Sequence, residues 1–194
     1  DGSDPTTSST NQAETPLVIN SAVTVKALAV RSGYADSLIA SASYTQLILS
    51  IGMNYQGGKI AYIDGTGQHG FVVAPSQGSS IWGCQGIAVG ASGIGIGTGG
   101  QNTDNILAGC ATSGAARIAR EYTGGGYTDW NLPSKDELNL IYTNRIALGV
   151  NTSYEVYSSS EISADFAWGQ FMVNGGQYVY AKSALINIMP IRYY

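Results

Sequence analysis

The clearest helical spacing of apolar residues lies in residues 126–142, which read GYTDWNLPSKDELNLIY. The apolar positions that recur at this spacing are Leu138, Ile141 and Tyr142. Ser134 precedes them at an N-cap position, and Glu137 follows three residues later as its reciprocal partner. The pattern predicts a short extended segment, a Pro-marked turn and a capped helix. Two residues of the extended segment are expected to enter the core: Trp130 and Leu132.

Strand-like alternation surrounds this helix on both sides. Residues 59–63 alternate, DGTGQHG forms a Gly-rich turn, and residues 71–74 are apolar, which predicts a β-hairpin. A second hairpin is expected where the NGG turn of residues 174–176 separates an aromatic strand ending at Trp168 from a Tyr-rich strand. The chain closes on a further strand, IMPIRYY. In these last strands we assign two residues to the core: Trp168 and Ile191.

A long Gly-rich run, residues 83–100, separates the first hairpin from a second predicted helix. Asn102 or Thr103 can cap this helix, which we expect to continue to about Tyr122. Its buried side is expected to contain Ile106, Leu107, Cys110, Ala111, Ile118, Ala119 and Tyr122. Three small residues, 113–115, suggest that another backbone approaches closely.

Residues 1–45 form a separate compositional unit. The run DGSDPTTSST consists of turn formers, and two short strand-like segments follow it. The apolar positions of these segments are Val18, Ala22, Val23, Val25, Ala27 and Leu28. Because the chain begins in what looks like a turn, we expect sequence upstream of Asp1. The second unit, residues 46–194, opens at Gln46.

Composition restricts the class of protein. The 194 residues include 26 Gly and 13 Tyr, and only 11% are charged, which favours short strands and loops over a helical bundle. A net charge of −4 with scattered basic residues argues against a nucleic-acid partner. No apolar run approaches the roughly 20 residues that span a bilayer, and no signal peptide is visible. We therefore expect no direct membrane insertion.

The chain offers few groups for catalysis or for metal binding. Cys84 and Cys110 either form a disulfide or remain a pair of buried free thiols. With one histidine, His69, they do not complete a usual zinc site. Asp64 and His69 flank a turn whose glycines explain it as a tight loop. The Gly-rich run is not followed by the Lys-Ser/Thr or the βα pattern of a nucleotide site, so no cofactor, metal site or catalytic residue is expected.

From residue 52 onward the chain resembles one bacterial family. The motifs, in order, are GGKIAYID, QHGFVVAPS, WGC, IGTGGQNT, an Ala-Ala-Arg helix, GYTDWNLPSKDELNLIY, YSSSE, FAWGQF, NGGQ and PIR. They resemble the C-terminal domain of the Legionella collagen-like adhesin and its relatives. That resemblance implies an α+β, C-type-lectin-like fold, with two helices and short twisted antiparallel strands, also similar to the formylglycine-generating enzyme.

The enzyme of this fold works through two cysteines near its C-terminal end. This chain has no cysteine after Cys110, so that oxidation chemistry is not expected. The first unit resembles the second half of the β-sandwich module of chitobiase-type proteins. The matching pieces are residues 1–6, 23–30, 33–37 and 44–45. This resemblance implies a partial Ig-like β-sandwich that acts as a spacer.

Other proteins with this fold are diversified at their C-terminal end by retroelements that mutate adenines in Asn-type codons. This chain carries residues that such mutation can yield at Gly169, Phe171, Gly176, Ser183, Ala184, Leu185 and Ile186. Met189 and Tyr193 depart from the family pattern. The alternative is ordinary drift on a tolerant surface.

The resemblance places a ligand-binding face on the last strands, where Tyr supplies rigid contact area and amides supply adaptable hydrogen bonds. The residues expected on it are Gln170, Gln177, Tyr178, Tyr180, Lys182, Ser183, Leu185 and Asn187. Calcium-dependent sugar binding would need more carboxylates than Glu155, Glu161 and Asp165.

We therefore expect a secreted, cell-surface or virion-surface protein that binds a protein or a glycan. The alternative is a structural subunit that uses the same face for self-association in a fibre or filament.

Overall fold

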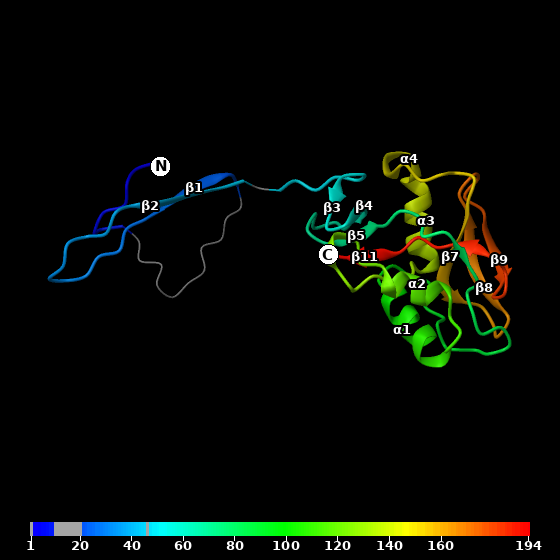
Figure 1. Cartoon of the computed structure of the whole chain (residues 1–194). Helices are drawn as coiled ribbons and strands as arrows, with labels where there is room; N and C mark the ends of the chain where they lie inside the picture. Colours follow the sequence, from blue (N-terminus) through cyan, green and yellow to red (C-terminus); the bar gives the residue numbers. More distant parts are fainter. Residues whose placement is uncertain (1, 10–20, 46) are drawn as a thin grey trace. The chain divides into compact units, whose positions relative to one another are not determined.

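The chain divides into two units, each described here by itself. A computed structural model describes residues 2–9, 21–45 and 47–194. The compact units are Asp1–Ile48 and Leu49–Tyr194, so the division falls three residues after the boundary expected from composition. Figure 1 shows helices only in the second unit. The first part of the expected strand pattern, at Val18, lies outside the described residues.

The first unit contains an antiparallel pair of strands. β1 (Val23–Ala27) and β2 (Ala40–Tyr44) pair with Val23 opposite Tyr44. Between them, the backbone N–H of Ser37 donates to the carbonyl oxygen of Ala29, and Gly33 takes a positive φ of 81° in the expected turn. The described residues of this unit thus form a two-stranded sheet. They correspond to the strands expected around residues 23–30 and 44–45.

One sheet of the second unit is built around the first predicted hairpin. Its strands are β3 (Asn54–Tyr55), β4 (Gly58–Ile63), β5 (Gly70–Val73) and β11 (Ile191–Tyr193). They lie in the order β11-β5-β4-β3, and all neighbours are antiparallel. The β4–β5 hairpin is confirmed. In its turn Asp64 accepts hydrogen bonds from the backbone and hydroxyl of Thr66, at 3.0 and 2.6 Å, as a turn-forming carboxylate does.

The other sheet carries the C-terminal strands. It consists of β6 (Ser79–Ser80), β7 (Glu155–Glu161), β8 (Phe166–Phe171), β9 (Gln177–Ala181) and β10 (Ile186–Asn187). Their order is β6-β10-β7-β8-β9, with β10 parallel to β7. The hairpin expected at residues 174–176 is confirmed as β8–β9. β9 lies at one edge of this sheet.

The helices differ from the expectation in number and extent. The described residues contain α1 (Gly99–Gly109), α2 (Ala115–Glu121), α3 (Lys135–Thr143) and α4 (Arg145–Leu148), and a 3₁₀ turn, η1 (Gly124–Gly126). The prediction of one helix from residue 102 to 122 is wrong. Cys110 has an extended backbone, with φ −136° and ψ 92°, which ends α1 and lets the chain restart as α2.

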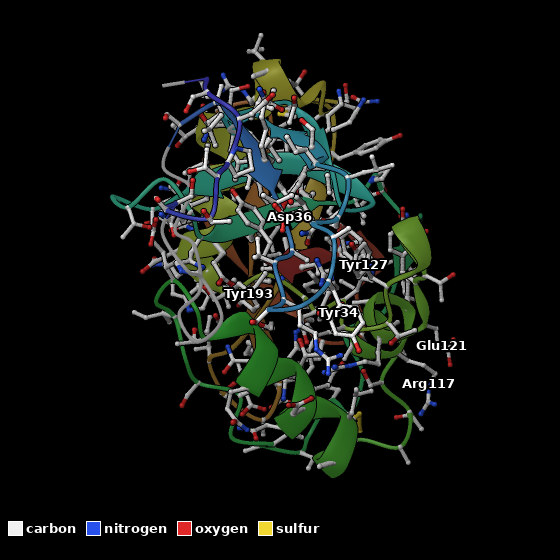
Figure 2. The ribbon with its side chains drawn as sticks, turned by 90° about the vertical axis from the view of Figure 1, so that its left-hand side faces the viewer. Tyr34, Asp36, Arg117, Glu121, Tyr127 and Tyr193 are labelled. Atoms are coloured by element: carbon white, nitrogen blue, oxygen red, sulfur yellow. A yellow bond between two sulfur atoms is a disulfide. The ribbon has the colours of Figure 1, made fainter. Side chains whose placement is uncertain are left out.

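The small residues after this break let residues 80–81 approach closely, as the sequence suggested. A Cβ at Gly114 would lie 2.2 Å from the Ser80 hydroxyl oxygen and 2.8 Å from the Ile81 carbonyl oxygen. Arg117 and Glu121 lie on the outer side of α2 and point away from it (Figure 2). Ala111, expected on the buried side, is exposed because it belongs to the connection rather than to a helix.

The capping box of α3 is confirmed. The backbone N–H of Ser134 donates to Oε2 of Glu137 at 2.6 Å, and the N–H of Glu137 donates to the Ser134 hydroxyl oxygen at 3.3 Å. Glu137 is fully buried, and its Oε1 accepts from the N–H of Gly97 and the hydroxyl of Tyr193, each at 2.7 Å. Burial and then the Glu137 carboxylate raise the pKa of Tyr193. This carboxylate joins the Gly-rich run, the helix start and the last strand.

Both sheets contribute to the core, and α1 and α3 pack on β7. Trp130, Leu132 and Ile191 are fully buried, as predicted. The core assignment of Trp168 is wrong. That side chain is partly exposed, and the Lys135 ammonium lies 4.4 Å from its ring centre. At this point α3 covers the sheet only with Lys135, whose long side chain is itself partly exposed. The Trp168 ring beneath it therefore remains partly exposed as well.

Candidate functional site

The eight residues expected on one binding face lie on β8, on β9, on the turn after β9 and on β10. Gln170 lies opposite Gln177, and Gly169 lies opposite Tyr178. Because opposite residues in antiparallel strands share a face, the two glutamines face one side, and Tyr178 faces the other. The expected set is therefore not one surface.

The glutamine side lies against α3. Nε2 of Gln170 donates to Oδ1 of Asn139 at 2.9 Å, and Nε2 of Gln177 donates to the carbonyl oxygen of Lys135 at 2.9 Å. Gln170 is fully buried, so its placement on the surface was wrong, and Gln177 is half-buried. The physical reason is that α3 packs on β7 and β8 and needs polar partners from the sheet. Both amides hold the scaffold together.

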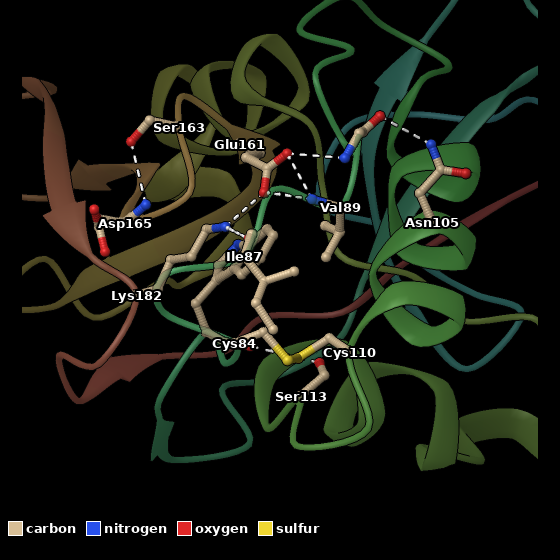
Figure 3. Close-up of polar contacts among 12 residues, drawn as sticks. Cys84, Ile87, Val89, Asn105, Cys110, Ser113, Glu161, Ser163, Asp165 and Lys182 are labelled. Carbon is tan, nitrogen blue, oxygen red and sulfur yellow. Dashed lines mark hydrogen bonds and ion pairs between the residues drawn. A yellow bond between two sulfur atoms is a disulfide. The ribbon is translucent and has the colours of Figure 1, made fainter.

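Lys182 is also buried, which contradicts its expected exposure. Its ammonium lies 2.5 Å from Oε1 of Glu161 and donates to the carbonyl oxygen of Ile87 at 2.8 Å (Figure 3). The ring of Trp82 lies beneath the same ammonium, 4.6 Å away. Lys182 follows the last residue of β9, so strand alternation no longer fixes the direction of its side chain. That direction is fixed instead by the buried carboxylate of Glu161, on β7.

The Gly-rich run is fixed on this ion pair and on a disulfide. Glu161 accepts hydrogen bonds from the backbone N–H groups of Val89 and Gly90, both at 2.9 Å. Nδ2 of Asn105 donates to the carbonyl oxygen of Gly90 at 3.0 Å. The disulfide Cys84–Cys110 is confirmed and ties the start of the run to the end of α1. Figure 3 shows these contacts side by side. The run is therefore held at several points.

The opposite side of the sheet carries two tyrosine rings that lie over glycines. A Cβ at Gly169 would lie 2.9 Å from the Tyr180 ring, and one at Gly176 would lie 2.5 Å from the Tyr178 ring. The absence of side chains at both glycines gives the rings room to lie along the backbone. Tyr178 remains 47% exposed, and Tyr180 is partly exposed. Tyr178 thus presents aromatic surface to solvent, whereas Tyr180 also packs on the core, edge-on against the ring of Tyr157 at 6.2 Å.

A carboxylate belongs to the same side. The hydroxyl of Tyr180 lies near the Glu155 carboxylate, which affects its pKa. Burial, followed by the nearby charge of Glu155, raises the pKa of Tyr180 above its ordinary value. Glu155 entered the sequence argument only as a candidate calcium ligand. Its position opposite Phe171, on the Tyr178 side of the sheet, follows only from the strand register.

The turn after β9 completes this surface. The Tyr157 hydroxyl oxygen lies 2.6 Å from the carbonyl oxygen of Ala181 and 3.1 Å from that of Ala184, which fixes the turn over the sheet. Ser183 and Leu185 point outward, and Leu185 is 72% exposed. We call the surface formed by Glu155, Tyr178, Tyr180, Ser183 and Leu185 the tyrosine face.

Asn187 does not lie free on this surface. Its Nδ2 donates to the carbonyl oxygen of Glu155 at 3.2 Å, and its Oδ1 lies 3.3 Å from the Ser76 hydroxyl oxygen. It is half-buried and joins β10 to the strand that carries Glu155. Asn187 therefore binds the backbone of Glu155 and is not itself part of the tyrosine face.

Carboxylates do not gather at the tyrosine face. In the part of the chain that the structure describes, no group of three or more His, Cys, Asp or Glu side chains could hold a metal ion. Glu161 is engaged by Lys182, and Glu155 by Tyr180. The polar groups of the tyrosine face are the hydroxyls of Tyr178, Tyr180 and Ser183 and the single carboxylate of Glu155.

One family model matches part of the chain. The Fn3-associated family matches residues 1–44. No curated protein matches the chain. The match covers the two strands of the first unit and indicates a β-rich surface module. Across residues 2–9, 21–45 and 47–194, no helix is long and apolar enough to cross a membrane.

Proposed function

We propose that this chain is a surface-exposed ligand-binding domain of the adhesin or receptor-binding kind, and that its tyrosine face contacts a protein or a glycan. The observation that carries the proposal is the pair of rings of Tyr178 and Tyr180 laid over glycines on an edge hairpin. Tyrosines held in this way lose little rotamer entropy when a ligand covers them. Glu155 adds a carboxylate near Tyr180, and Ser183 adds an exposed hydroxyl on the turn that follows β9.

The proposed fold is C-type-lectin-like. Two small sheets with α1 and α3 packed on the long strand β7, and a C-terminal strand that returns to the first sheet, support this assignment together with the motif series. In such a fold the C-terminal strands would be the variable, ligand-contacting part. The α3 capping box, the disulfide and the Lys182–Glu161 pair would be the constant scaffold.

We propose an extracellular or virion-surface location. Disulfides persist in oxidising compartments, and the Fn3-associated match is to a module that we interpret as a spacer. Protease protection of the full chain on intact cells or particles tests the location. Degradation by added protease without lysis is expected, and protection until lysis would contradict it.

The exposed positions of the C-terminal strands are also candidates for retroelement diversification. Ser183 and Leu185 are exposed at the tyrosine face, whereas Ile186 is buried. A near-repeat of the 3′ end of the gene, adjacent to a reverse transcriptase, is the expected genomic signature. Its absence from the flanking DNA would leave ordinary drift as the explanation.

Binding arrays with matched variants test the proposed face. We expect the full chain to bind a subset of glycan or protein probes, and Tyr178→Ala to lose that binding. Tyr34→Ala is the matched control, because Tyr34 is 67% exposed but belongs to the first unit. Equal binding by the wild type and Tyr178→Ala would overturn the proposal. Tyr180→Ala is the second test, in which thermal unfolding monitors the fold.

A structural subunit of a fibre is the second candidate function. It is favoured by the edge position of β9, where Val179 is 50% exposed on the side opposite Tyr178. An edge strand of this kind can pair with another copy. Light scattering after size-exclusion chromatography separates the two: a monodisperse monomer across the micromolar range would exclude the fibre function.

A further inference from the structure

A cleft in the second unit lies away from the tyrosine face. It has a volume of about 700 Å³ and opens between the ends of β4 and β5 and the connection from α4 to β7. Its walls include three tyrosines, three amide side chains and one lysine: Tyr55, Tyr122, Tyr154, Asn54, Gln56, Asn151 and Lys59. None of its lining residues belongs to the tyrosine face. We call it the lysine cleft.

Two of its aromatic walls are held in place from behind. The ring of Tyr55 packs edge-on against Tyr194 at 5.2 Å, and the ring of Tyr122 packs edge-on against Trp130 at 4.8 Å. Gly57, between the β3 and β4 strands, has φ +88°, and a Cβ there would lie 2.3 Å from the carbonyl oxygen of Gly124. This backbone contact keeps Tyr122 beside the β3–β4 turn. The cleft is therefore formed before any ligand arrives.

The charged and polar groups of the cleft are mostly hydrogen-bond donors. Lys59 donates one hydrogen bond, to the carbonyl oxygen of Leu148 at 2.9 Å, and an ammonium has three N–H groups. The amide oxygen of Gln56 accepts from Arg192, and that of Asn151 accepts from the N–H of Ser153, which leaves both NH₂ groups for a ligand. The lining contains no Asp or Glu side chain. A ligand must therefore supply acceptors and negative charge.

We propose that the lysine cleft binds an acidic sugar residue, a pyranose ring that carries a carboxylate. Lys59 would bind the carboxylate, and the amide NH₂ groups of Gln56 and Asn151 would donate to ring and hydroxyl oxygens. The tyrosine rings would cover the flat C–H faces of the sugar. An extended peptide fits less well, because the edge strand β3 has only two residues and offers little free backbone for strand addition. The site is independent of the tyrosine face.

Titration of the ¹⁵N-labelled full chain by nuclear magnetic resonance tests this site. The probes are sodium glucuronate and glucose, which share a pyranose ring and differ at the carboxylate. We expect saturable shifts of the amides of residues 54–59 and 148–154 with glucuronate, and about tenfold weaker binding of glucose. Equal affinities, or shifts confined to residues 177–185, would overturn the proposal.

Matched variants assign the effect to the cleft. Lys59→Met is expected to weaken glucuronate binding about tenfold, whereas Arg117→Met, which removes an exposed positive charge on α2, leaves it unchanged. Asn151→Ala is the second variant, because Asn151 is exposed on a loop and its replacement spares the core. Thermal unfolding of each variant confirms folding. Wild-type affinity in both cleft variants would overturn the proposal.

Two further outcomes separate this site from the tyrosine face and from a peptide site. Tyr178→Ala is expected to bind glucuronate like the wild type, so failure at one site leaves the other measurable. A short peptide with a free C-terminal carboxylate, titrated in the same way, is expected to bind more weakly than glucuronate. If the peptide saturates the same amides more tightly, the acidic-sugar assignment is wrong.

Discussion

The Lys182 ammonium lies 2.5 Å from the Glu161 carboxylate, and both side chains are buried. Glu161 also accepts from the backbone of Val89 and Gly90, and Lys182 donates to the carbonyl oxygen of Ile87. A buried pair of this kind is tolerated because every charged atom has partners. It joins the end of strand β9 to the Gly-rich run.

Removing one member of this pair is expected to be costly. Lys182→Met leaves Glu161 charged and buried, and the free energy of unfolding should fall by about 3–5 kcal/mol. Urea denaturation monitored by tryptophan fluorescence measures the change. Asp104→Asn is the control, because the Arg120–Asp104 pair is largely exposed and should contribute less than about 1 kcal/mol. Similar losses in the two variants would contradict a special role for the buried pair.

The same pair predicts acid sensitivity. Burial alone would raise the pKa of Glu161, but the hydrogen bond from Lys182, the backbone donors and the charge of Lys182 outweigh it and hold the pKa below its ordinary value of 4.5. Since the folded-state pKa is lower than the unfolded one, this stabilisation is complete above about pH 4.5 and is lost as the pH falls through the folded value. Urea denaturation between pH 7 and pH 3 should show a steeper loss for the wild type than for Glu161→Gln. Parallel pH profiles of stability for the wild type and Glu161→Gln would contradict the role of Glu161 in acid sensitivity.

The disulfide is expected to stabilise the second unit substantially. Cys84 and Cys110 are 26 positions apart, and closing a loop of this size removes roughly 3–4 kcal/mol of unfolded-state entropy. Cys84→Ser/Cys110→Ser should lower the urea midpoint accordingly. Dithiothreitol should lower the wild-type midpoint by a similar amount and leave the double variant unchanged. A reductant effect on the double variant would show that the loss has another cause.

Gly169 is expected to be intolerant of a side chain. In Gly169→Ala the new Cβ would lie 2.8 Å from the carbonyl oxygen of Val156 and 2.9 Å from the Tyr180 ring. Overpacking should cost about 1–3 kcal/mol and displace the ring, so ligand binding at the tyrosine face should fall. Gly65→Ala is the matched control, because nothing lies within 4 Å of a Cβ there. Circular-dichroism melts and the binding arrays measure both effects; equal behaviour of the two variants would exclude the ring contact.

Local signals explain which elements the sequence predicted. The Ser134–Glu137 capping box, the Gly-rich turn after Asp64 and the Asn-Gly-Gly turn after Val173 act over a few residues. Such signals depend on neighbours in the chain, so α3 and the two hairpins could be predicted without tertiary information. The burial of Trp130, Leu132 and Ile191 followed from their apolar character.

Long-range contacts explain the rest. Nothing local to Gln170 or Lys182 indicates burial, because their partners Asn139 and Glu161 come from other elements. The break between α1 and α2 occurs where Cys110 bonds to Cys84. Packing between distant parts of the chain therefore decided that Gln170 and Lys182 are buried and that α1 ends at Gly109.

The sequence by itself determined the local elements, the Cys84–Cys110 candidate pair and the presence of tyrosines in the last strands. Only the tertiary structure decided which tyrosines face solvent, that Glu155 lies beside Tyr180, and that Lys59 lines a cleft with no carboxylate. The reason is physical. A strand pattern has two possible faces. The register of β7, β8 and β9, with α3 covering one side, decides which side chains lie on the other side.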